Sequence, residues 1–440
     1  MRPLILFATI ALAPMALSGP LPAQPTAAQA QVNGREVASA VRRLLDEHYV
    51  LPEMRPKFDA VLAKAEAAGR YDGISAGELA ERLNADLHSV TPDKHLGIMI
   101  DPEQSRQLAA APPHAGADDA PPSADDILQA TQINHGISEL KILAGNVRYM
   151  KYDGFVWAGP KTAEALDTAM RFLHDGDAAI LDVRENGGGS PEAVQYLVSH
   201  FLPPKRPIVT FYMGGKPAQG LSTLSSLPAG RMVGKPLYVL TSEGTASAAE
   251  EFTGHIAGFK IGELIGDTTA GAGYRNEFYP LPQGMIISIS VGRAVLASTG
   301  KDWEGVGIAP TTKVTPAKAL DVAQAHALRR IAASASADEK RAFEARATLL
   351  DAKVNPVESA LPLAAYAGSY GERSVAVEDG KLAYRRNGGP KLNLVGVGAN
   401  RFAFEEDPQT YVEFAVAGSS VTGFDLVRSD GSRVVAKRSN

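Results

Sequence analysis

The sequence contains no cysteine among its 440 residues. This absence excludes disulfide bonds, thiol catalysis and cysteine-ligated metal sites. Basic residues are not in excess, because the net charge is −5, so nucleic acid is not expected as a partner. The chain also lacks an H-E-x-x-H pair, a G-x-G-x-x-G loop and a P-loop, so neither a metal nor an organic cofactor is expected.

Long apolar runs are missing outside the N-terminus, where Leu4 to Leu17 form a stretch that Pro14 interrupts. One early arginine precedes this stretch, and the small residues Ala28-Gln29-Ala30 follow it, as is typical of a cleavable signal peptide. The stretch is too short and broken for a membrane-spanning helix. We therefore predict a signal peptide over residues 1–30, a periplasmic or secreted mature protein and no membrane anchor. The oligomeric state is not indicated.

The rest of the chain predicts an α/β protein with smaller flanking domains. Apolar residues recur at helical spacing in the first part, strand and helix patterns alternate in the middle, and short strands with Asp-Gly turns fill the last part. The alternation in the middle predicts parallel strands joined by helices. The predicted units are a helical domain over 31–108, an Ala-, Pro- and Asp-rich linker over 109–131, an α/β core over 132–335, a helical connector over 336–356 and a β domain over 357–440.

A serine stands where one predicted strand gives way to a helix. In TSEGTASAAEEF, residues 241–252, Ser247 lies at the helix start, where unpaired backbone N–H groups and the helix dipole favour negative charge. One interpretation is that Ser247 is an N-cap. The other is that it is a nucleophile, which requires a base, a group that orients the base, and oxyanion donors.

Three consecutive glycines, Gly187 to Gly189, end another predicted strand in ILDVRENGGGS. Glycines allow backbone N–H groups to approach a reacting carbonyl without obstruction by side chains. A tight turn with only a structural role is the simpler alternative. A phosphate-binding loop is a further alternative, although the segment lacks the spacing and the lysine-serine ending of such loops.

Among the nine histidines, His95 is the preferred base because it stands between a polar turn and a predicted strand, in DKHLGIMI. A side chain at such a junction can be held rigidly and still face a cleft. The carboxylate that orients the base comes from KDWEGVGIAP, where Asp302 and Glu304 are both suitable. Spacing alone does not choose between them.

Together these motifs resemble the serine peptidases that include C-terminal processing peptidases, tricorn protease and the repeats of interphotoreceptor retinoid-binding protein. LDVRENGGG is similar to D-L-R-x-N-x-G-G, TSEGTASAAEEF to T-S-x-x-x-S-A-x-E, and WEGVGIAPTTKV to G-x-G-V-x-P-D-x-x-V, although Thr311 replaces the usual aspartate. The resemblance implies a crotonase-like (ClpP/crotonase-type) α/β core with Ser247 as nucleophile. It also implies an oxyanion hole formed by the N–H of Ala248 and that of Gly188 or Gly189.

Processing peptidases of this family carry a lysine base about twenty-five residues after the serine, but position 272 is alanine. DKHLGIMI instead resembles the D-x-H-L segment of the tricorn and retinoid-binding-like branch. This resemblance implies His95 as base and Glu304 as its orienting carboxylate. The expected activity is hydrolysis of peptides or proteins through an acyl-enzyme. The alternatives are a non-catalytic binder of apolar ligands and a serine hydrolase that acts on esters or cell-wall components.

Overall fold

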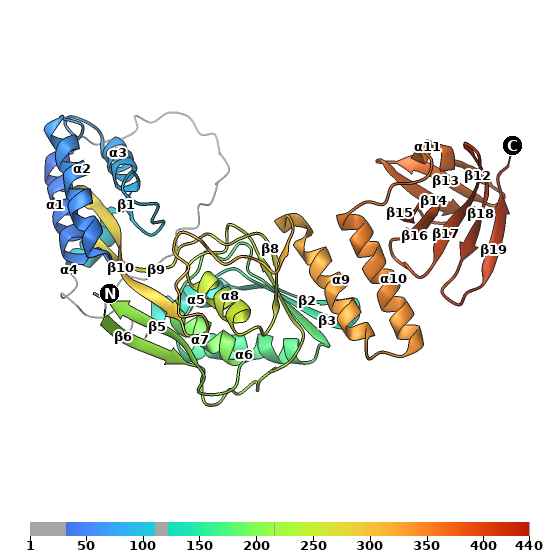
Figure 1. The fold of residues 1–440 in the computed structure, drawn as a ribbon, viewed down its shortest axis with the longest axis horizontal. Helices are drawn as coiled ribbons and strands as arrows, with labels where there is room; N and C mark the ends of the chain where they lie inside the picture. The colour runs from blue at the N-terminus through green and yellow to red at the C-terminus, as the bar shows by residue number, and fades with distance from the viewer. Residues whose placement is uncertain (1–31, 111–121, 215, 440) are drawn as a thin grey trace.

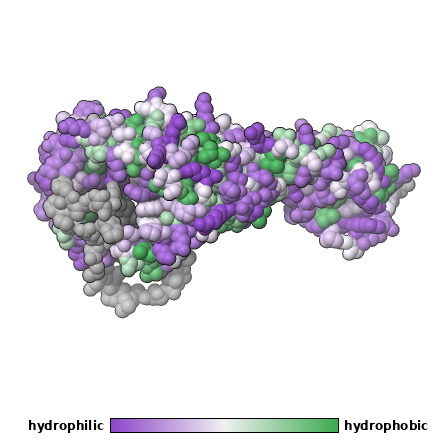
Figure 2. Space-filling view, turned by 90° about the horizontal axis from the view of Figure 1, so that it is seen from below, coloured by the Kyte–Doolittle hydropathy of each residue, from purple (hydrophilic) through white to green (hydrophobic). Residues whose placement is uncertain are grey.

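The computed structural model describes residues 32–110, 122–214 and 216–439. A helical unit, a central α/β unit and a C-terminal β unit follow one another along the long axis of the molecule (Figure 1). The face seen in Figure 2 is mainly hydrophilic, with scattered apolar patches. Within the described ranges, no helix combines the length and apolar character that crossing a membrane requires.

Amphipathic helices form the N-terminal unit. They are α1 (Gly34–His48), α2 (Arg55–Ala67) and α3 (Ala76–His88), with a 3-10 turn over Pro52–Met54. Asn33 and Ser75 begin α1 and α3 by accepting backbone N–H groups of the first turn with their side chains. The apolar faces of the helices form one core with the side chains of Ile287 and Ile289. A strand of the next unit therefore completes the core of the helical unit.

That strand belongs to a five-stranded sheet with the order β1-β10-β5-β6, in which β9 also pairs with β10. Its strands are β1 (Gly97–Ile100), β5 (Pro207–Met213), β6 (Lys216–Ser222), β9 (Tyr274–Leu281) and β10 (Met285–Leu296), with α4 (Pro102–Ala110) after β1 and a 3-10 turn over Pro282–Gly284. All of the pairings are antiparallel. Since β10 pairs with β1, this long strand holds the segment that follows His95.

The central sheet has six strands in the order β11-β8-β7-β4-β3-β2. They are β2 (Ile137–Leu143), β3 (Val147–Tyr152), β4 (Ala178–Asp182), β7 (Leu237–Thr241), β8 (Glu263–Gly266) and β11 (Thr312–Lys313). All are parallel except β2, which forms a hairpin with β3. The strands β4 and β7 are buried along their whole length. Both faces of the sheet are thus covered, as is usual for parallel sheets.

Helices cover the two faces of this sheet. The segments are α5 (Ala124–Gln132), a 3-10 turn over Asn134–Gly136, α6 (Pro160–His174), α7 (Pro191–Ser199), α8 (Ala248–Gly258), a 3-10 turn over Pro316–Lys318, and α9 (Ala319–Ala332). Leu181 and Val239 share one core with α6, α7 and α8. Ile180 and Leu240, the alternate residues of the same strands, pack with α9 on the other face.

The helix α10 (Ala337–Val354) packs against α9 and leads to the C-terminal unit. That unit comprises α11 (Leu363–Tyr366), β12 (Gly368–Tyr370), β13 (Arg373–Glu378), β14 (Lys381–Arg386), β15 (Leu392–Gly398), β16 (Arg401–Phe404), β17 (Tyr411–Ala417), β18 (Ser420–Val427) and β19 (Arg433–Lys437). Each of these strands pairs antiparallel with the next. The expected Asp-Gly turn joins β13 to β14, with positive φ at both Asp379 and Gly380.

The α/β prediction is confirmed at the level of strands, helices and a C-terminal β sheet. Parallel pairing was wrong for residues 207–213, because this strand joins the antiparallel second sheet. The segment predicted as a linker, 109–131, contains all of α5 except its last residue, while 111–121 lies outside the described residues. The predicted signal peptide, 1–30, also lies outside them.

Candidate active site

Ser247 is the N-cap residue of α8, but its backbone is unlike that of an ordinary N-cap. Its φ is 54° and its ψ is −120°, whereas an N-cap usually has extended angles with negative φ. A non-glycine residue held in such a region costs about 1–3 kcal/mol and persists only where its surroundings impose it. The N-cap interpretation is therefore correct for the position of Ser247 and does not account for its conformation.

The surroundings that impose this conformation centre on the carboxylate of Glu250, which is fully buried. It accepts the N–H of Ser247 at 3.0 Å and the N–H groups of Gly271 and Ala272 at 2.6 and 2.7 Å. The hydroxyl of Thr269 donates to it at 2.5 Å. One side chain thus ties the backbone of Ser247 to the loop 269–272.

The glycine loop lies directly against Ser247. A Cβ added to Gly188 would be 2.7 Å from Ser247 Cβ, and the φ of Gly188 is 112°, so both space and backbone require glycine. The N–H of Gly188 donates to Asn186 Oδ1 at 2.9 Å. In the described part of the chain, no hydrogen bond engages the N–H of Gly189 or of Ala248. Of the three predicted oxyanion donors, Gly188 is therefore already occupied, while Gly189 and Ala248 are free.

His95 directly precedes the segment that forms β1. Its backbone N–H donates to Asp93 Oδ1 at 2.9 Å, and the hydroxyl of Tyr49 donates to the other oxygen of Asp93 at 3.1 Å. The ring atom Nδ1 is buried and has no hydrogen-bond partner among the described residues. Burial lowers the pKa of His95, and the nearby charge of Asp93 opposes this shift. The lowered pKa favours a neutral ring, which is the form that accepts a proton.

Glu304 lies beside His95 and Asp93. Its Oε2 accepts the N–H groups of Gly273 and Tyr274 at 2.6 and 3.0 Å. One ligand atom from each of Asp93, His95 and Glu304 lies within 4.8 Å of the others. Burial raises the pKa of Glu304 to about 7, although the bond from Gly273 opposes the shift, and the charge of Asp93 raises it further.

Asp302, the alternative to Glu304, has a different partner. Both of its contacts are with Arg293, whose Nε donates to Asp302 Oδ2 at 2.7 Å and whose Nη2 also donates to that oxygen. The geometry therefore favours Glu304, two residues later, as the carboxylate that faces His95.

The two halves of the candidate site meet at one loop. Residues 269–272 hold Glu250 on the side of Ser247, and the next two residues hold Glu304 on the side of His95. Lys94 also donates to the carbonyl of Ala270, which joins the His95 segment to the same loop. Across the described residues, no hydrogen bond links the Ser247 hydroxyl or Glu304 to the His95 ring. The structure thus brings the halves together without closing a hydrogen-bonded triad.

Comparison with known families bears on these motifs. Residues 146–314 match "Peptidase family S41", and residues 30–134 match the "N-terminal domain of Peptidase_S41 in eukaryotic IRBP". The chain contains a peptidase family S41 domain. The predicted resemblance to processing peptidases and retinoid-binding-like repeats is thereby confirmed. The matches span the segments that carry Ser247, Glu304 and His95, and family S41 indicates a peptidase of the serine type.

Among the relatives of the chain is the carboxy-terminal processing protease CtpB of Bacillus subtilis (strain 168). It is 28% identical over 180 residues, which cover 40% of this chain and 36% of the relative. The chloroplastic C-terminal processing peptidase of Tetradesmus obliquus is 30% identical over 139 residues, covering 31% and 28%. The matched segments thus span about a third of the length of these relatives.

Among solved structures, the photosystem II D1 C-terminal processing protease is 15% identical and has a TM-score of 0.43, covering 65% of this chain and 94% of that chain. Tricorn protease is 11% identical and has a TM-score of 0.40, covering 65% and 35%. Because these TM-scores are low, the fold is described from the strand order in the sheets of this protein.

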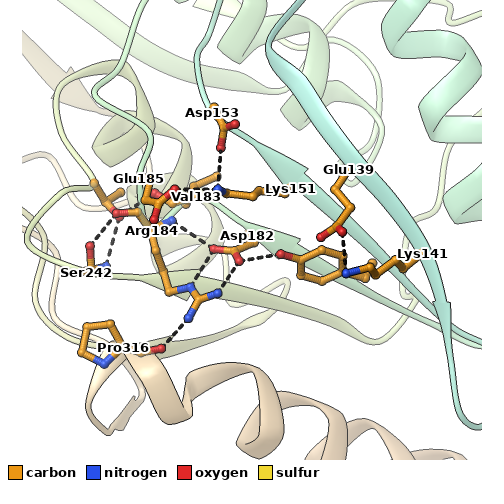
Figure 3. A network of polar contacts seen from close by, with 12 residues as sticks. Glu139, Lys141, Lys151, Asp153, Asp182, Val183, Arg184, Glu185, Ser242 and Pro316 are labelled. Atoms are coloured by element: carbon orange, nitrogen blue, oxygen red, sulfur yellow. Dashed lines mark hydrogen bonds and ion pairs between the residues drawn. The ribbon is translucent and has the colours of Figure 1, made fainter. Parts of the chain in front are cut away.

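A second polar network in the S41 domain fixes the start of the glycine loop (Figure 3). Arg184 Nε and Nη2 donate to the two oxygens of Asp182, which also accepts the hydroxyl of Tyr149 at 2.7 Å. Ser242 donates its hydroxyl to the carbonyl of Arg184 at 2.5 Å, and Arg184 Nη1 donates to the carbonyl of Pro316 at 2.5 Å. The carboxyl ends of β4 and β7, which lead to Gly188 and Ser247, are thereby held together.

Sequence reasoning did not assign roles to three residues of this arrangement: Asp93, Asn186 and Glu250. All three are buried, and their partners are mostly backbone groups. Each stands inside a motif that was recognised. The signal that the sequence offered was therefore an acid or amide within a recognised motif to which no role had been assigned.

Proposed function

We propose that this protein is an exported serine peptidase that cleaves peptide bonds through Ser247, His95 and Glu304. The observation that carries the proposal is the strained backbone of Ser247 at the start of α8, packed against Gly188 and joined through one loop to the His95 cluster. A simple helix cap does not require this arrangement. The core that presents these residues is proposed to be of the crotonase type.

In the proposed mechanism, His95 accepts the proton of the Ser247 hydroxyl as its oxygen attacks the substrate carbonyl. The free N–H groups of Ala248 and Gly189 stabilise the oxyanion. His95 then gives the proton to the leaving amine, and the acyl group remains on Ser247 as an ester. A water molecule, deprotonated by His95, releases the acid and restores the serine.

Glu304 is proposed to orient the ring of His95 and to stabilise its charged form. The two N–H groups that Glu304 accepts hold its carboxylate in place. For the triad to close, the His95 ring must approach both Ser247 and Glu304 more closely. Catalytic hydrogen bonds are often long in unliganded sites and shorten when substrate binds.

The substrate is proposed to be a peptide or protein, because the named relatives are processing proteases. Export is proposed from the signal-peptide pattern over residues 1–30. Alanine at position 272 supports histidine rather than lysine as the base.

The proposal is tested by labelling the mature protein with a fluorophosphonate and by digesting casein. Wild type, Ser247→Ala, His95→Ala, Glu304→Gln and Asp302→Asn are compared. We expect labelling and digestion to be lost in the first two variants, to fall by about a hundredfold or more in Glu304→Gln, and to persist in Asp302→Asn. Equal labelling of wild type and Ser247→Ala would refute the proposal.

A further inference from the structure

Asp93, His95 and Glu304 form a cluster of three metal-ligating side chains without a cation. Their ligand atoms lie within 4.8 Å of one another. No salt bridge from a described residue reaches Asp93 or Glu304, because Lys94 donates to a carbonyl and Arg293 pairs with Asp302. Two carboxyl groups therefore lie beside one imidazole, and no lysine or arginine among the described residues forms a salt bridge with them.

One ring nitrogen of His95 lacks a hydrogen-bond partner among the described residues. Nδ1 of His95 is buried and unpaired within the described ranges. A buried polar atom normally has a hydrogen-bond partner, and an exception calls for a specific explanation, such as an ion that occupies the site. A neutral imidazole nitrogen is also among the commonest ligands for transition metals.

The two carboxylates are already oriented by other groups. Asp93 accepts the Tyr49 hydroxyl and the backbone N–H of His95, with one bond to each oxygen. Glu304 uses Oε2 for both of its backbone donors, so Oε1 receives no hydrogen bond from the described residues. Metal-binding carboxylates are usually held by such outer hydrogen bonds, which fix the ligand before the metal arrives.

The spacing suits a small divalent metal after modest side-chain rotation. Nitrogen and oxygen ligands lie about 2.0–2.2 Å from Zn²⁺, so ligands at the corners of a tetrahedron are about 3.3–3.6 Å apart. The observed upper limit is 4.8 Å. One imidazole with two carboxylates favours Zn²⁺ and similar transition metals over Mg²⁺ or Ca²⁺, which prefer sites made only of oxygen.

We infer that Asp93, His95 and Glu304 bind a divalent transition metal, with Zn²⁺ as the probe, and that the bound metal switches off the serine chemistry. The inhibitory part rests on the proposed function. A metal on the ring nitrogen that faces the carboxylates leaves the ring hydrogen on the other nitrogen, which then cannot accept the proton of Ser247. The metal also holds the Glu304 carboxylate away from its orienting role. Removal of the metal frees both groups, so the inhibition is reversible.

The experiment uses tag-free mature protein that has been treated with a chelator and then freed of it. Zn²⁺ binding is measured by calorimetry, and Co²⁺ binding by visible absorption. The fluorophosphonate labelling rate is followed with Zn²⁺ and again after EDTA. We expect one Zn²⁺ per chain, a loss of labelling that follows site occupancy, and recovery with EDTA. In His95→Gln, and in Glu304→Gln as the second variant, Zn²⁺ affinity should fall by about a hundredfold.

The matched control is His326→Ala, because His326 also faces a carboxylate, with Nδ1 2.9 Å from Glu263 Oε1. This variant should bind Zn²⁺ like wild type. Binding that is unchanged in His95→Gln, or absent in wild type, would overturn the metal site even if labelling is normal. Binding that depends on His95, in a protein whose Ser247 never reacts, would support the site and overturn the peptidase and its inhibition. Circular dichroism confirms that each variant is folded.

Discussion

Gly188 is the residue at which one added methyl group most directly tests the contact between the glycine loop and the serine. In Gly188→Ala the new Cβ would lie 2.7 Å from Ser247 Cβ and 2.9 Å from the Ala246 carbonyl. These neighbours are a Cβ and a backbone oxygen, which cannot swing aside like the end of a long side chain, so we expect the labelling rate of Ser247 to fall by about a hundredfold. The labelling rate of Ser247 is measured with a fluorophosphonate.

The matched control is Gly187→Ala, since a Cβ at that glycine would meet no atom within 4 Å. It should label like wild type. If both alanine variants reacted normally, Gly188 would not be in contact with a working nucleophile, and the loop would have only a structural role.

Glu250 provides a second prediction at this scale. In Glu250→Gln the amide nitrogen would face a backbone donor, which leaves a buried N–H without an acceptor. We expect the free energy of unfolding to fall by about 3 kcal/mol. The labelling rate should fall by about tenfold or more. Denaturant unfolding and labelling measure the two effects.

Glu251→Gln separates the role of Glu250 from the general cost of changing a buried acid. Glu251 is also buried in α8, but it contacts the ring of His255 at 3.3 Å. This variant should lose stability without losing the reactivity of Ser247. A Glu250→Gln protein that labels at the wild-type rate would contradict the positioning role.

At the scale of single elements, the end of α7 should make folding sensitive to acid. His200 is fully buried there, its Nδ1–H donates to the carbonyl of Gly230 at 2.9 Å, and burial lowers its pKa from 6.5 to about 4. Between these two values the unfolded chain binds a proton that the folded protein does not. Stability should therefore fall by about 3 kcal/mol as the pH drops from 6.5 to about 4, and level off below.

Unfolding by urea at several pH values tests this expectation. His200→Gln should show a shallower loss over the same range, whereas His174→Gln, at the exposed end of α6, should keep the slope of wild type. Identical slopes for His200→Gln and wild type would show that another group causes the acid sensitivity.

Elements with a clear hydrophobic pattern of their own could be predicted from the sequence, but the pairing of strands within the sheets could not. The helical spacing over 34–48 and the buried run over 178–182 each define their element locally. The strand at 285–296 looks like a core strand, yet its partners are 97–100, 207–213 and 274–281. No local pattern specifies those pairings, so the second sheet was missed.

The same limit applies to the candidate site. Ser247, His95 and Glu304 stand in motifs that a single sequence displays. Glu250 was not singled out because its role depends on the backbone of residues 269–272, which lie far from it in the sequence. A buried carboxylate whose partners are main-chain groups leaves no complementary residue type to recognise.

For the whole molecule, the C-terminal β unit should be dispensable for the reaction at Ser247. It has its own aromatic core, and its polar contacts with α10 include the ion pair of Glu405 with Lys353 and the bond from Arg346 to the Glu405 carbonyl. In Figure 1 it lies at the end opposite the helical unit. A chain that ends at residue 356 should label within about twofold of wild type, since distant units act independently.

Labelling rate and thermal unfolding of this shortened chain test the independence. A second unfolding transition that disappears on truncation would support it. A well-folded shortened chain that no longer labels would show instead that the β unit takes part in the chemistry.

The proposed base and the proposed nucleophile lie beside two different hydrophobic cores, and both β10 and β5 contribute residues to each core. His95 lies next to Leu96, which packs in the core of the helical unit, and Ser247 lies next to Ala248, which packs in a core of the central unit. Loosening the helical unit would therefore move the base while the serine turn stays in place. If the proposed mechanism holds, we expect a copy of the chain whose helical unit has not folded to be inactive even when Ser247 is in place.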